Sequence, residues 1–244
     1  MANRSEFSAT TGTHVSDELL NACAALFSSN YGIWGKSGFS PGTAGKRVKM
    51  SAARLREQSL SVPDQTVLAT CKIDDKLVGH AFATVWSYDG GKVAWITQLV
   101  VDQSVRRRYI ATQLLQAFKL HELFRDITAI GLASSHPASV NVLAKYSHVR
   151  LENIDIQFIA LNAAKILKDT PINYLKPENV PLRGSLFEND CASGAISSAF
   201  TQFYVDHAEP LEALHEFMAS GRWCLGELLE GHEFLVIVPV VVDY

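Results

Sequence analysis

The sequence predicts an α+β fold, that is, a mixed α/β domain in which helices flank a central mixed β-sheet. The chain has 244 residues, of which 48% are hydrophobic and 19% charged, so it can bury a large core. Strand-like and helix-like periodicities both occur, and in the middle of the chain they follow the order βββ-αβαβ. A β-α-β pattern comes after them. We therefore expect a flexible tail over residues 1–14, a core over 15–160, and a C-terminal elaboration over 161–244 that packs on the core.

In the first part of this core, the sequence predicts two helices and an antiparallel meander. Ser16 is a good N-cap, and apolar residues follow it at helical spacing as far as Phe27. A glycine-rich loop leads to a second, short helix over 51–59. Two turns, at Asp74-Asp75 and Asp89-Gly90-Gly91, separate three strands. These strands are expected over residues 66–72, 77–86 and 92–101.

The second part of the core alternates helices with strands. Ile110, Leu114 and Phe118 lie on one face of a predicted helix. A continuous apolar strand is expected over 127–133. A helix beginning at Pro137 follows it, because proline is favourable in the first turn. The last core element is a strand over 151–160.

In the C-terminal elaboration, the sequence predicts a strand, a helix and a final strand. The first strand covers 195–205. Asp206 and Glu209 fit a capping box that opens the helix. The final strand covers 233–242. The expected buried face of the helix consists of Leu211, Leu214, Phe217 and Met218.

Composition excludes several classes of protein. With 22 basic and 25 acidic residues the chain has a net charge of −3, which disfavours a protein that coats nucleic acid. The four cysteines are scattered and form no CxxC pair, so reduced thiols are expected, with no metal site and no disulfide framework. The N-terminus lacks the apolar core of a signal peptide, and the longest apolar run is too short to cross a bilayer. We expect a cytoplasmic protein without a membrane partner.

The most informative segment lies between the third strand and the following helix. The strand ends at Asp102, three consecutive arginines occupy the turn, and a helix begins at Ile110. A helix start presents free N–H groups and a partial positive charge. Together with Arg106–Arg108 it suits a multiply phosphorylated ligand. A solvated basic turn is an equally consistent interpretation of the composition alone.

This segment resembles the GNAT superfamily of N-acetyltransferases. The family motif is Arg/Gln-x-x-Gly-x-Gly/Ala, and the chain reads Arg106-Arg107-Arg108-Tyr109-Ile110-Ala111, with Tyr109 in place of the usual glycine. The family's Asn-Pro-Ala helix start corresponds to His136-Pro137-Ala138. Leu143 stands at the position of the customary catalytic tyrosine. The resemblance, to fungal GNAT-like proteins in particular, covers roughly residues 15–160.

The resemblance implies an acyl-CoA-dependent N-acyltransferase that moves acetyl from acetyl-CoA directly to an amine, expected to be a small molecule. The pantetheine arm would lie between the strands at 92–101 and 127–133. A non-catalytic acyl-CoA-binding or sensor module is the alternative, and the chain is expected to be a monomer or a homodimer. The implied cofactor-binding residues are Leu99, Val100, Val101, Arg106, Arg107, Arg108, Tyr109, Ile110, Ala111, Thr112, His136 and Asn141.

Proton transfer needs a separate explanation, because the customary groups are absent. The strand 92–101 contains no carboxylate, although Thr97 or Gln98 could order a water molecule. His80, on the neighbouring strand, is a candidate base with a suitable intrinsic pKa, and a structural histidine is the alternative. Tyr146 is a nearby polar substitute for the missing acid. The candidate catalytic residues are therefore His80, Gln98 and Tyr146.

Overall fold

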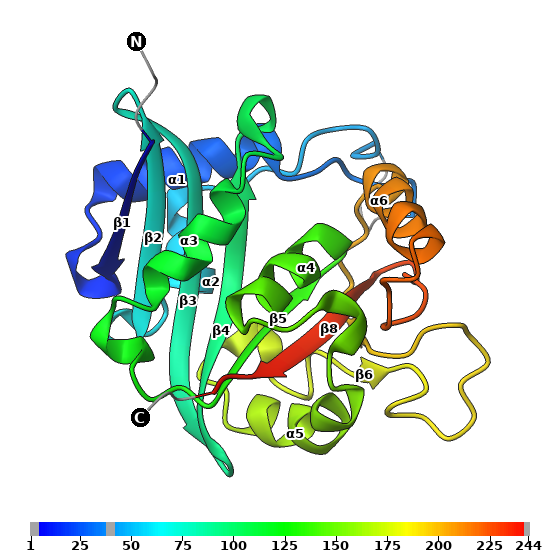
Figure 1. Ribbon diagram of the computed structural model, residues 1–244. Helices are drawn as coiled ribbons and strands as arrows, with labels where there is room; N and C mark the ends of the chain where they lie inside the picture. The colour runs from blue at the N-terminus through cyan, green and yellow to red at the C-terminus, as the bar shows by residue number, and fades with distance from the viewer. Residues whose placement is uncertain (1–4, 38–41, 242–244) are drawn as a thin grey trace.

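The computed structural model describes residues 5–37 and 42–241. Within these residues, eight strands form one mixed sheet in the order β1-β2-β3-β4-β5-β8-β7-β6. Helices cover both of its faces (Figure 1). The expected class, a mixed sheet flanked by helices, is confirmed.

The elements have the following bounds. The strands are β1 (Ser5–Thr11), β2 (Thr66–Ile73), β3 (Lys76–Tyr88), β4 (Gly91–Val101), β5 (Ala129–Ser134), β6 (Leu182–Arg183), β7 (Ser198–Phe200) and β8 (His232–Pro239). The helices are α1 (Asp17–Asn30), α2 (Ala52–Ser59), α3 (Ile110–Phe118), α4 (Pro137–Tyr146), α5 (Ile156–Lys168) and α6 (Ala208–Ala219).

Local capping signals place the first helices correctly. The Ser16 hydroxyl accepts a hydrogen bond from the Leu19 amide at 3.2 Å, and Ser51 caps α2 in the same way through the Arg54 amide. The meander over β2, β3 and β4 also forms as expected, with antiparallel pairing throughout.

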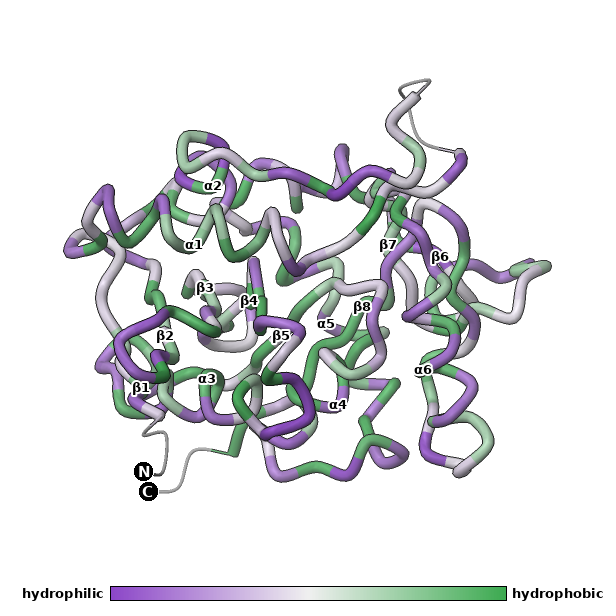
Figure 2. The backbone as a smooth tube through the Cα atoms, turned by 90° about the horizontal axis from the view of Figure 1, so that it is seen from above, coloured by the Kyte–Doolittle hydropathy of each residue, from purple (hydrophilic) through white to green (hydrophobic). Residues whose placement is uncertain are grey.

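Two helical layers enclose the sheet. Figure 2 shows α1 and α2 on one side of β3 and β4, and α3 and α4 on the other. Leu20 of α1 and Leu55 of α2 pack against Phe82 on the first face. On the second face, α3 approaches so closely that a Cβ on Gly79 would lie 3.1 Å from Ile110 and Leu114. The sheet is therefore buried on both faces along its central strands.

The expected N-terminal tail is wrong for residues 5–14. Ser5–Thr11 forms β1, which pairs antiparallel with β2 from Ser5 opposite Ile73 to Thr11 opposite Val67. A 3₁₀ turn follows at Gly12–His14. Phe7 and Ala9 pack against the main core, so the segment satisfies the edge of β2 and buries apolar surface as well. Residues 1–4 of the expected tail lie outside the described residues.

The expected strand at 151–160 is also wrong. A 3₁₀ turn covers Leu151–Asn153, and Asp155 then caps α5 by accepting a hydrogen bond from the Phe158 amide at 3.0 Å. Ile159, Ala163 and Ile166 are buried at helical spacing. The place beside β5 is filled by β8, which pairs antiparallel with it from Ala129 opposite Pro239 to Ser134 opposite Phe234.

The C-terminal elaboration differs from expectation in detail. The strand expected at 195–205 shortens to β7, and the final strand ends at Pro239. The expected capping box is wrong: the N-cap of α6 is His207, and Asp206, one residue earlier, accepts a hydrogen bond from the Ala208 amide at 2.8 Å. Leu211 and Met218, expected to be buried, are 36% and 49% exposed. The reason is that α6 lies at the periphery beyond α4 and buries only a narrow face (Figure 1).

Candidate functional site

The turn between β4 and α3 is built tightly. Asp102 accepts hydrogen bonds from the amide and the hydroxyl of Ser104, at 2.9 and 2.7 Å, and so closes a 3₁₀ turn at Gln103–Val105. Arg107 and Tyr109 then adopt the left-handed conformation, with φ of 62° and 61°. This conformation is uncommon for residues other than glycine. The chain thus keeps the backbone shape of a glycine at the position where Tyr109 replaces it.

This turn delivers a helix start that is free to bind an anion. The first hydrogen bond of α3 runs from the Gln113 amide to the Tyr109 carbonyl, at 3.0 Å. The amides of Ile110, Ala111 and Thr112 precede it, and such amides have no acceptor within the helix. Arg107 and Arg108 are exposed beside them. The structure therefore brings the backbone of Arg106–Thr112 and two of the three arginines together in one basic turn.

The side chain of Arg106 points elsewhere. Its Nη2 donates to the Asn30 carbonyl at 2.6 Å, and its Nε donates to the Val101 carbonyl at 3.2 Å. Nη1 forms an ion pair with Glu209 at 2.7 Å. The guanidinium therefore ties the turn to α1 and α6, while only the backbone of Arg106 remains available to a ligand.

The ladder between β4 and β5 opens just before this turn. The two strands pair in parallel from Val93 opposite Ala129 to Ile96 opposite Leu132. At Thr97 a bulge interrupts the β3–β4 register. Beyond Ile96 the ladder between β4 and β5 ends. Residues 98–101 of β4 therefore pair with β3 but not with β5.

Backbone groups of β4 face this opening. The Asp102 amide donates to the Val78 carbonyl at 2.8 Å. Hydrogen-bonded pairs alternate along an antiparallel ladder, so the backbone groups of Val100, two residues earlier, also point toward β3. Leu99 and Val101 consequently turn their backbone groups away from β3. The Val101 carbonyl is taken by Arg106, which leaves the backbone of Leu99 and the Val101 amide.

The start of α4 lies on the other side of the opening. His136 caps this helix, since its Nδ1 accepts from the Ala138 amide at 3.1 Å, and Asn141 follows one turn later, partly buried. Glu209 of α6 lies 3.8 Å from His136 Nε2 as well as 2.7 Å from Arg106. The contacts with His136 and then Arg106 lower the pKa of Glu209 to about 2. Glu209 thus connects the β4–α3 turn to the start of α4.

His80 and Gln98 form a buried pair under β4. They are 0% and 7% exposed, and His80 Nε2 donates to Gln98 Oε1 at 2.6 Å. Burial lowers the pKa of His80 to about 4, although the hydrogen bond to Gln98 opposes this shift. The residue is neutral at neutral pH and has no exposed surface. This burial argues against His80 as the base that meets a substrate and leaves it a positioning role through Gln98.

Tyr146 lies far from these residues. It is 2% exposed in the last turn of α4, and the Lys119 ammonium is 4.7 Å from the centre of its ring. The opening is at the first turn of the same helix, roughly 14 Å away at 1.5 Å per residue. The structure therefore places Tyr146 away from the β4–α3 turn, and its role as a substitute for the catalytic acid stays a prediction.

Sequence reasoning did not single out an acidic residue at the head of β8. Glu233 lies at the start of β8, directly before Phe234, which pairs with Ser134 at the end of β5. Burial raises the pKa of the Glu233 carboxyl, and the nearby Ser135 backbone opposes the shift. The only local signal was an acidic residue at the head of the most apolar strand.

Two tyrosines lie within reach of the Glu233 charge. Burial and this charge raise the pKa of Tyr31, and they do the same to Tyr174. Tyr31 stacks on Phe27 with 4.2 Å between the ring centres and packs against the cluster that contains Val100 of β4. Of these residues, Tyr31 therefore packs next to β4.

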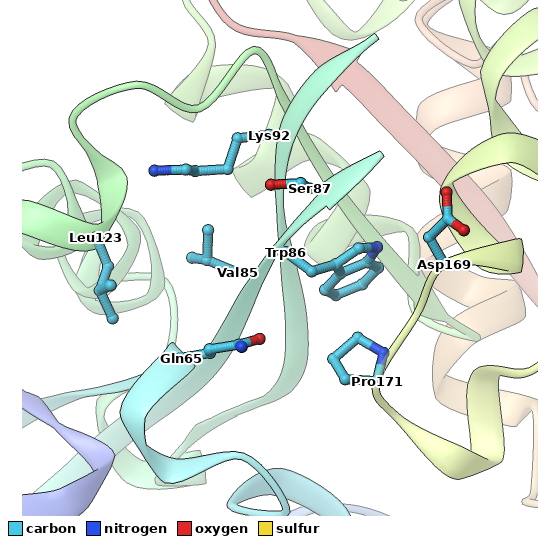
Figure 3. A pocket seen from close by; sticks show the side chains of 8 residues that line it. All are labelled: Gln65, Val85, Trp86, Ser87, Lys92, Leu123, Asp169 and Pro171. Atoms are coloured by element: carbon cyan, nitrogen blue, oxygen red, sulfur yellow. The ribbon is translucent and has the colours of Figure 1, made fainter. Parts of the chain in front are cut away.

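Two cavities lie away from the turn. One, of about 420 Å³, lies near the β3–β4 hairpin, where Lys92 and Asp169 stand on either side of Trp86 (Figure 3). The other, of about 570 Å³, lies beside Tyr146 and the end of α3. Neither is lined by residues 102–112.

Within residues 5–37 and 42–241, no group of three or more His, Cys, Asp and Glu side chains is arranged to hold a metal ion. None of the helices in these ranges has the length and apolar character needed to span a membrane.

The sequence matches the acetyltransferase (GNAT) family model over residues 37–146. No curated protein matches it. Among solved structures, it is similar to the glucosamine N-acetyltransferase region of a fungal multi-domain GH3 β-N-acetylglucosaminidase, with 16% identity, a TM-score of 0.42, and coverage of 56% of this chain and 14% of that one. It is also similar to a putative acetyltransferase from Pyrococcus horikoshii, with 19% identity, a TM-score of 0.37, and coverage of 57% and 42%.

A third similar structure is the GNAT family N-acetyltransferase YhbS from Escherichia coli in complex with CoA, with 13% identity, a TM-score of 0.41, and coverage of 66% of this chain and 73% of that one. The chain spans well under two thirds of the length of the first two structures. The family match covers α2, strands β2 to β5, the basic turn and α4. Residues 37–146, which contain the β4–α3 turn, are therefore similar to the GNAT family.

Proposed function

We propose that this protein is an acyl-CoA-dependent N-acyltransferase that transfers acetyl from acetyl-CoA directly to an amine. The observation that carries the proposal is the free helix start at Ile110–Thr112 directly after a strand whose backbone opens at Leu99. The first feature suits a pyrophosphate and the second suits an extended amide-bearing arm. Acetyl-CoA would supply the activated thioester.

The residues of the chain have distinct roles in this proposal. Amides of the α3 start would bind the phosphates, with Arg107 and Arg108 adding charge. The backbone of Leu99 and the Val101 amide would hold the arm, and a backbone N–H at the opening would polarise the thioester carbonyl. The amine must lose a proton to act as nucleophile, so a base or a water chain is required.

The acceptor is proposed to be a small amine. The C-terminal elaboration supplies Tyr174 and Glu233, which stand against Tyr31 of α1 on the face opposite α3 and α4. Side chains from three segments would thus enclose the amine on that side. The fungal structure named above has a glucosamine N-acetyltransferase region, which makes an amino sugar a useful probe.

A non-catalytic acyl-CoA sensor is the second candidate. It is favoured by one observation: β4 carries no carboxylate, and Tyr146 lies away from the opening. Thiol release from acetyl-CoA across a panel of amines separates the two candidates. Turnover supports the transferase, while coenzyme A binding without turnover supports the sensor.

The binding site itself is tested by calorimetry with coenzyme A. Arg107→Glu/Arg108→Glu should weaken binding more than tenfold, since each charge-assisted contact contributes about 1.5–3 kcal/mol. Arg125→Glu is the matched control, because Arg125 is equally exposed but follows the far end of α3. Equal affinity of the double variant and the control would contradict this placement.

A further inference from the structure

We propose that the free edge of β3, next to the β3–β4 hairpin, binds an extended peptide as an added strand, and that this peptide carries an acidic residue between two basic ones. The site is the cavity of about 420 Å³ shown in Figure 3. None of residues 102–112 lines this cavity, so the site is separate from the one proposed for coenzyme A. Strand pairing, the direction of backbone groups and the charges around the cavity support it.

The end of β3 has a neighbouring strand on one side only. Pairing with β2 begins at Thr66 opposite Thr84, whereas pairing with β4 continues to the hairpin. Before Thr66 the chain leaves the sheet in the 3₁₀ turn Pro63–Gln65. Residues 85–88 of β3 therefore have no partner strand on the β2 side within the described ranges. An edge of four residues is about 13 Å long, and its unpaired N–H and C=O groups are a template for another strand.

The backbone of Ser87 faces this free side. Lys92 lies opposite Ser87 in β4, but the Lys92 carbonyl accepts a hydrogen bond from the Thr128 amide at 2.7 Å, and the Lys92 amide donates to Thr128 Oγ1 at 3.2 Å. The backbone of Lys92 is therefore directed away from β3. In an antiparallel ladder, both residues of such a pair turn their N–H and C=O groups outward. The backbone groups of Ser87, which is an exposed residue, are thus available to another strand.

One side of the cavity belongs to the face of the sheet that α3 covers. A Cβ on Gly79 would lie 3.1 Å from side chains of α3, so every second residue of β3 after Gly79, including Ser87, points to this face. Lys92 lies opposite Ser87 and shares the face. Leu123, which follows α3, lines the cavity on the same side (Figure 3). Lys92 therefore supplies a positive charge on the α3 face.

The other side of the cavity belongs to the opposite face of the sheet. Trp86 points to that face, where its Nε1 donates to the Ile166 carbonyl of α5 at 3.1 Å. Asp169 and Pro171, which follow α5, line the cavity near the Trp86 ring (Figure 3). Asp169 thus supplies a negative charge on the face opposite Lys92.

These two charges select the side chains of an added strand. In the ranges that the structure describes, neither Lys92 nor Asp169 forms an ion pair. Adjacent residues of a strand point to opposite faces of the sheet. An acidic residue of the peptide would therefore meet Lys92, and the basic residues on either side of it would meet Asp169. The aliphatic stems of these basic residues would pack on Trp86 and Pro171.

The arrangement favours a strand over a small zwitterion. A free amino acid carries its ammonium and carboxylate on one carbon atom, whereas Lys92 and Asp169 lie on opposite faces with the edge of β3 between them (Figure 3). An extended chain passes along the edge and presents side chains to both faces at once. It also pairs with the N–H and C=O groups of Ser87, which is how peptides add to sheet edges.

The probe is a synthetic peptide, Thr-Lys-Glu-Lys-Thr, acetylated and amidated so that its ends carry no charge. Its symmetric sequence suits either strand direction, and Thr-Glu-Lys-Glu-Thr is the matched control with the charges exchanged. Binding to the full chain is followed by NMR titration. The first peptide should bind at least fivefold more tightly than the second, since each exposed ion pair changes affinity by up to about fivefold. It should also slow hydrogen exchange of the Ser87 amide.

Two kinds of variant separate the backbone from the charges. Ser87→Pro removes the N–H at an edge position, where proline is tolerated, and should weaken binding of Thr-Lys-Glu-Lys-Thr at least tenfold. Ser87→Ala keeps the N–H and should stay within twofold of the wild type. The double variant Lys92→Glu/Asp169→Lys should reverse the preference between the two peptides. This reversal remains a test if Ser87→Pro fails to fold.

Several results would overturn the inference. They are equal affinity for the two peptides, no binding of either peptide at millimolar concentration, unchanged affinity of a folded Ser87→Pro variant, and an unchanged preference in the double variant. Displacement of the peptide by an equal concentration of free lysine or glutamate would assign the cavity to a small molecule and would also overturn it. Because coenzyme A takes no part in these titrations, their outcome is independent of the proposed function.

Discussion

Arg106 provides the sharpest test of the site's construction, because the structure gives it a role unlike that of its two neighbours. Replacing it with alanine removes the donors to the carbonyls of Asn30 and Val101 and the partner of Glu209. Arg107 and Arg108 are exposed at the adjacent positions. Three consecutive arginines therefore offer a perturbation and its matched controls within one turn.

The magnitude follows from the contacts. Two hydrogen bonds from a charged donor to partly buried carbonyls contribute about 1.5 kcal/mol each at the lower end of their range, which suits a side chain that is 31% exposed. The ion pair with Glu209, whose side chain is 58% exposed, adds at most about 1 kcal/mol. Arg106→Ala should thus cost about 3–4 kcal/mol, or roughly 6–15 °C in melting temperature for a domain of this size.

The assay is urea unfolding followed by circular dichroism, with a thermal scan as the second measurement. Arg108→Ala should change the free energy of unfolding by less than about 0.5 kcal/mol, as surface substitutions usually do. Arg106→Lys should fall between the two, since an ammonium cannot reach all three acceptors at once. If Arg106→Ala unfolds at the same urea concentration as Arg108→Ala, the reasoning that Arg106 ties the turn to α1 and α6 is refuted.

Two further predictions concern the core. Truncation after residue 160 should give insoluble or unfolded material, because β8 is a central strand and its loss exposes the edge of β5; a soluble fragment that melts cooperatively and binds coenzyme A would contradict this. Stability should also fall by about 3 kcal/mol between pH 6.5 and pH 4, because His80, with its pKa lowered from 6.5 to about 4, must stay neutral in the fold while the unfolded chain takes the proton. Urea midpoints for His80→Gln should show a weaker pH dependence over this window, and an unchanged dependence would assign it to other groups.

The elements that the sequence predicts correctly have local signals. Ser16 and Ser51 mark the starts of α1 and α2, and turn residues separate β2, β3 and β4. The basic turn before α3 was also predictable, since its features lie within a few consecutive residues. In each case the physical cause is a contact between near neighbours along the chain.

The errors come from contacts between distant segments. Ser5–Thr11 is a polar segment whose strand conformation depends on pairing with β2, more than fifty residues later. The segment from 151 onward is apolar and short of turn signals, so its periodicity did not separate a strand from the helix that Asp155 caps. Contacts between distant segments therefore determined the structure of both of these segments.

In the candidate site, too, features set by near neighbours were predicted and features set by distant contacts were not. Residues 106–112 were assigned to one turn, but the direction of the Arg106 side chain depends on Asn30 and Glu209, which are 76 and 103 positions away. His80 was identified as a strand residue beside β4, yet its complete burial depends on how α1 packs over that face. Glu209 was assigned only to the cap of a helix, and its contacts with Arg106 and His136 depend on the packing of α6 near the β4–α3 turn.

The position of β8 also bears on how this chain could work without a carboxylate on β4. The C-terminal elaboration enters the sheet next to β5, so it contributes to the site rather than extending an outer edge. It brings Glu209 to the β4–α3 turn, where this acid is paired with Arg106 and His136. The paired acid is suited to hold the β4–α3 turn and α4 together.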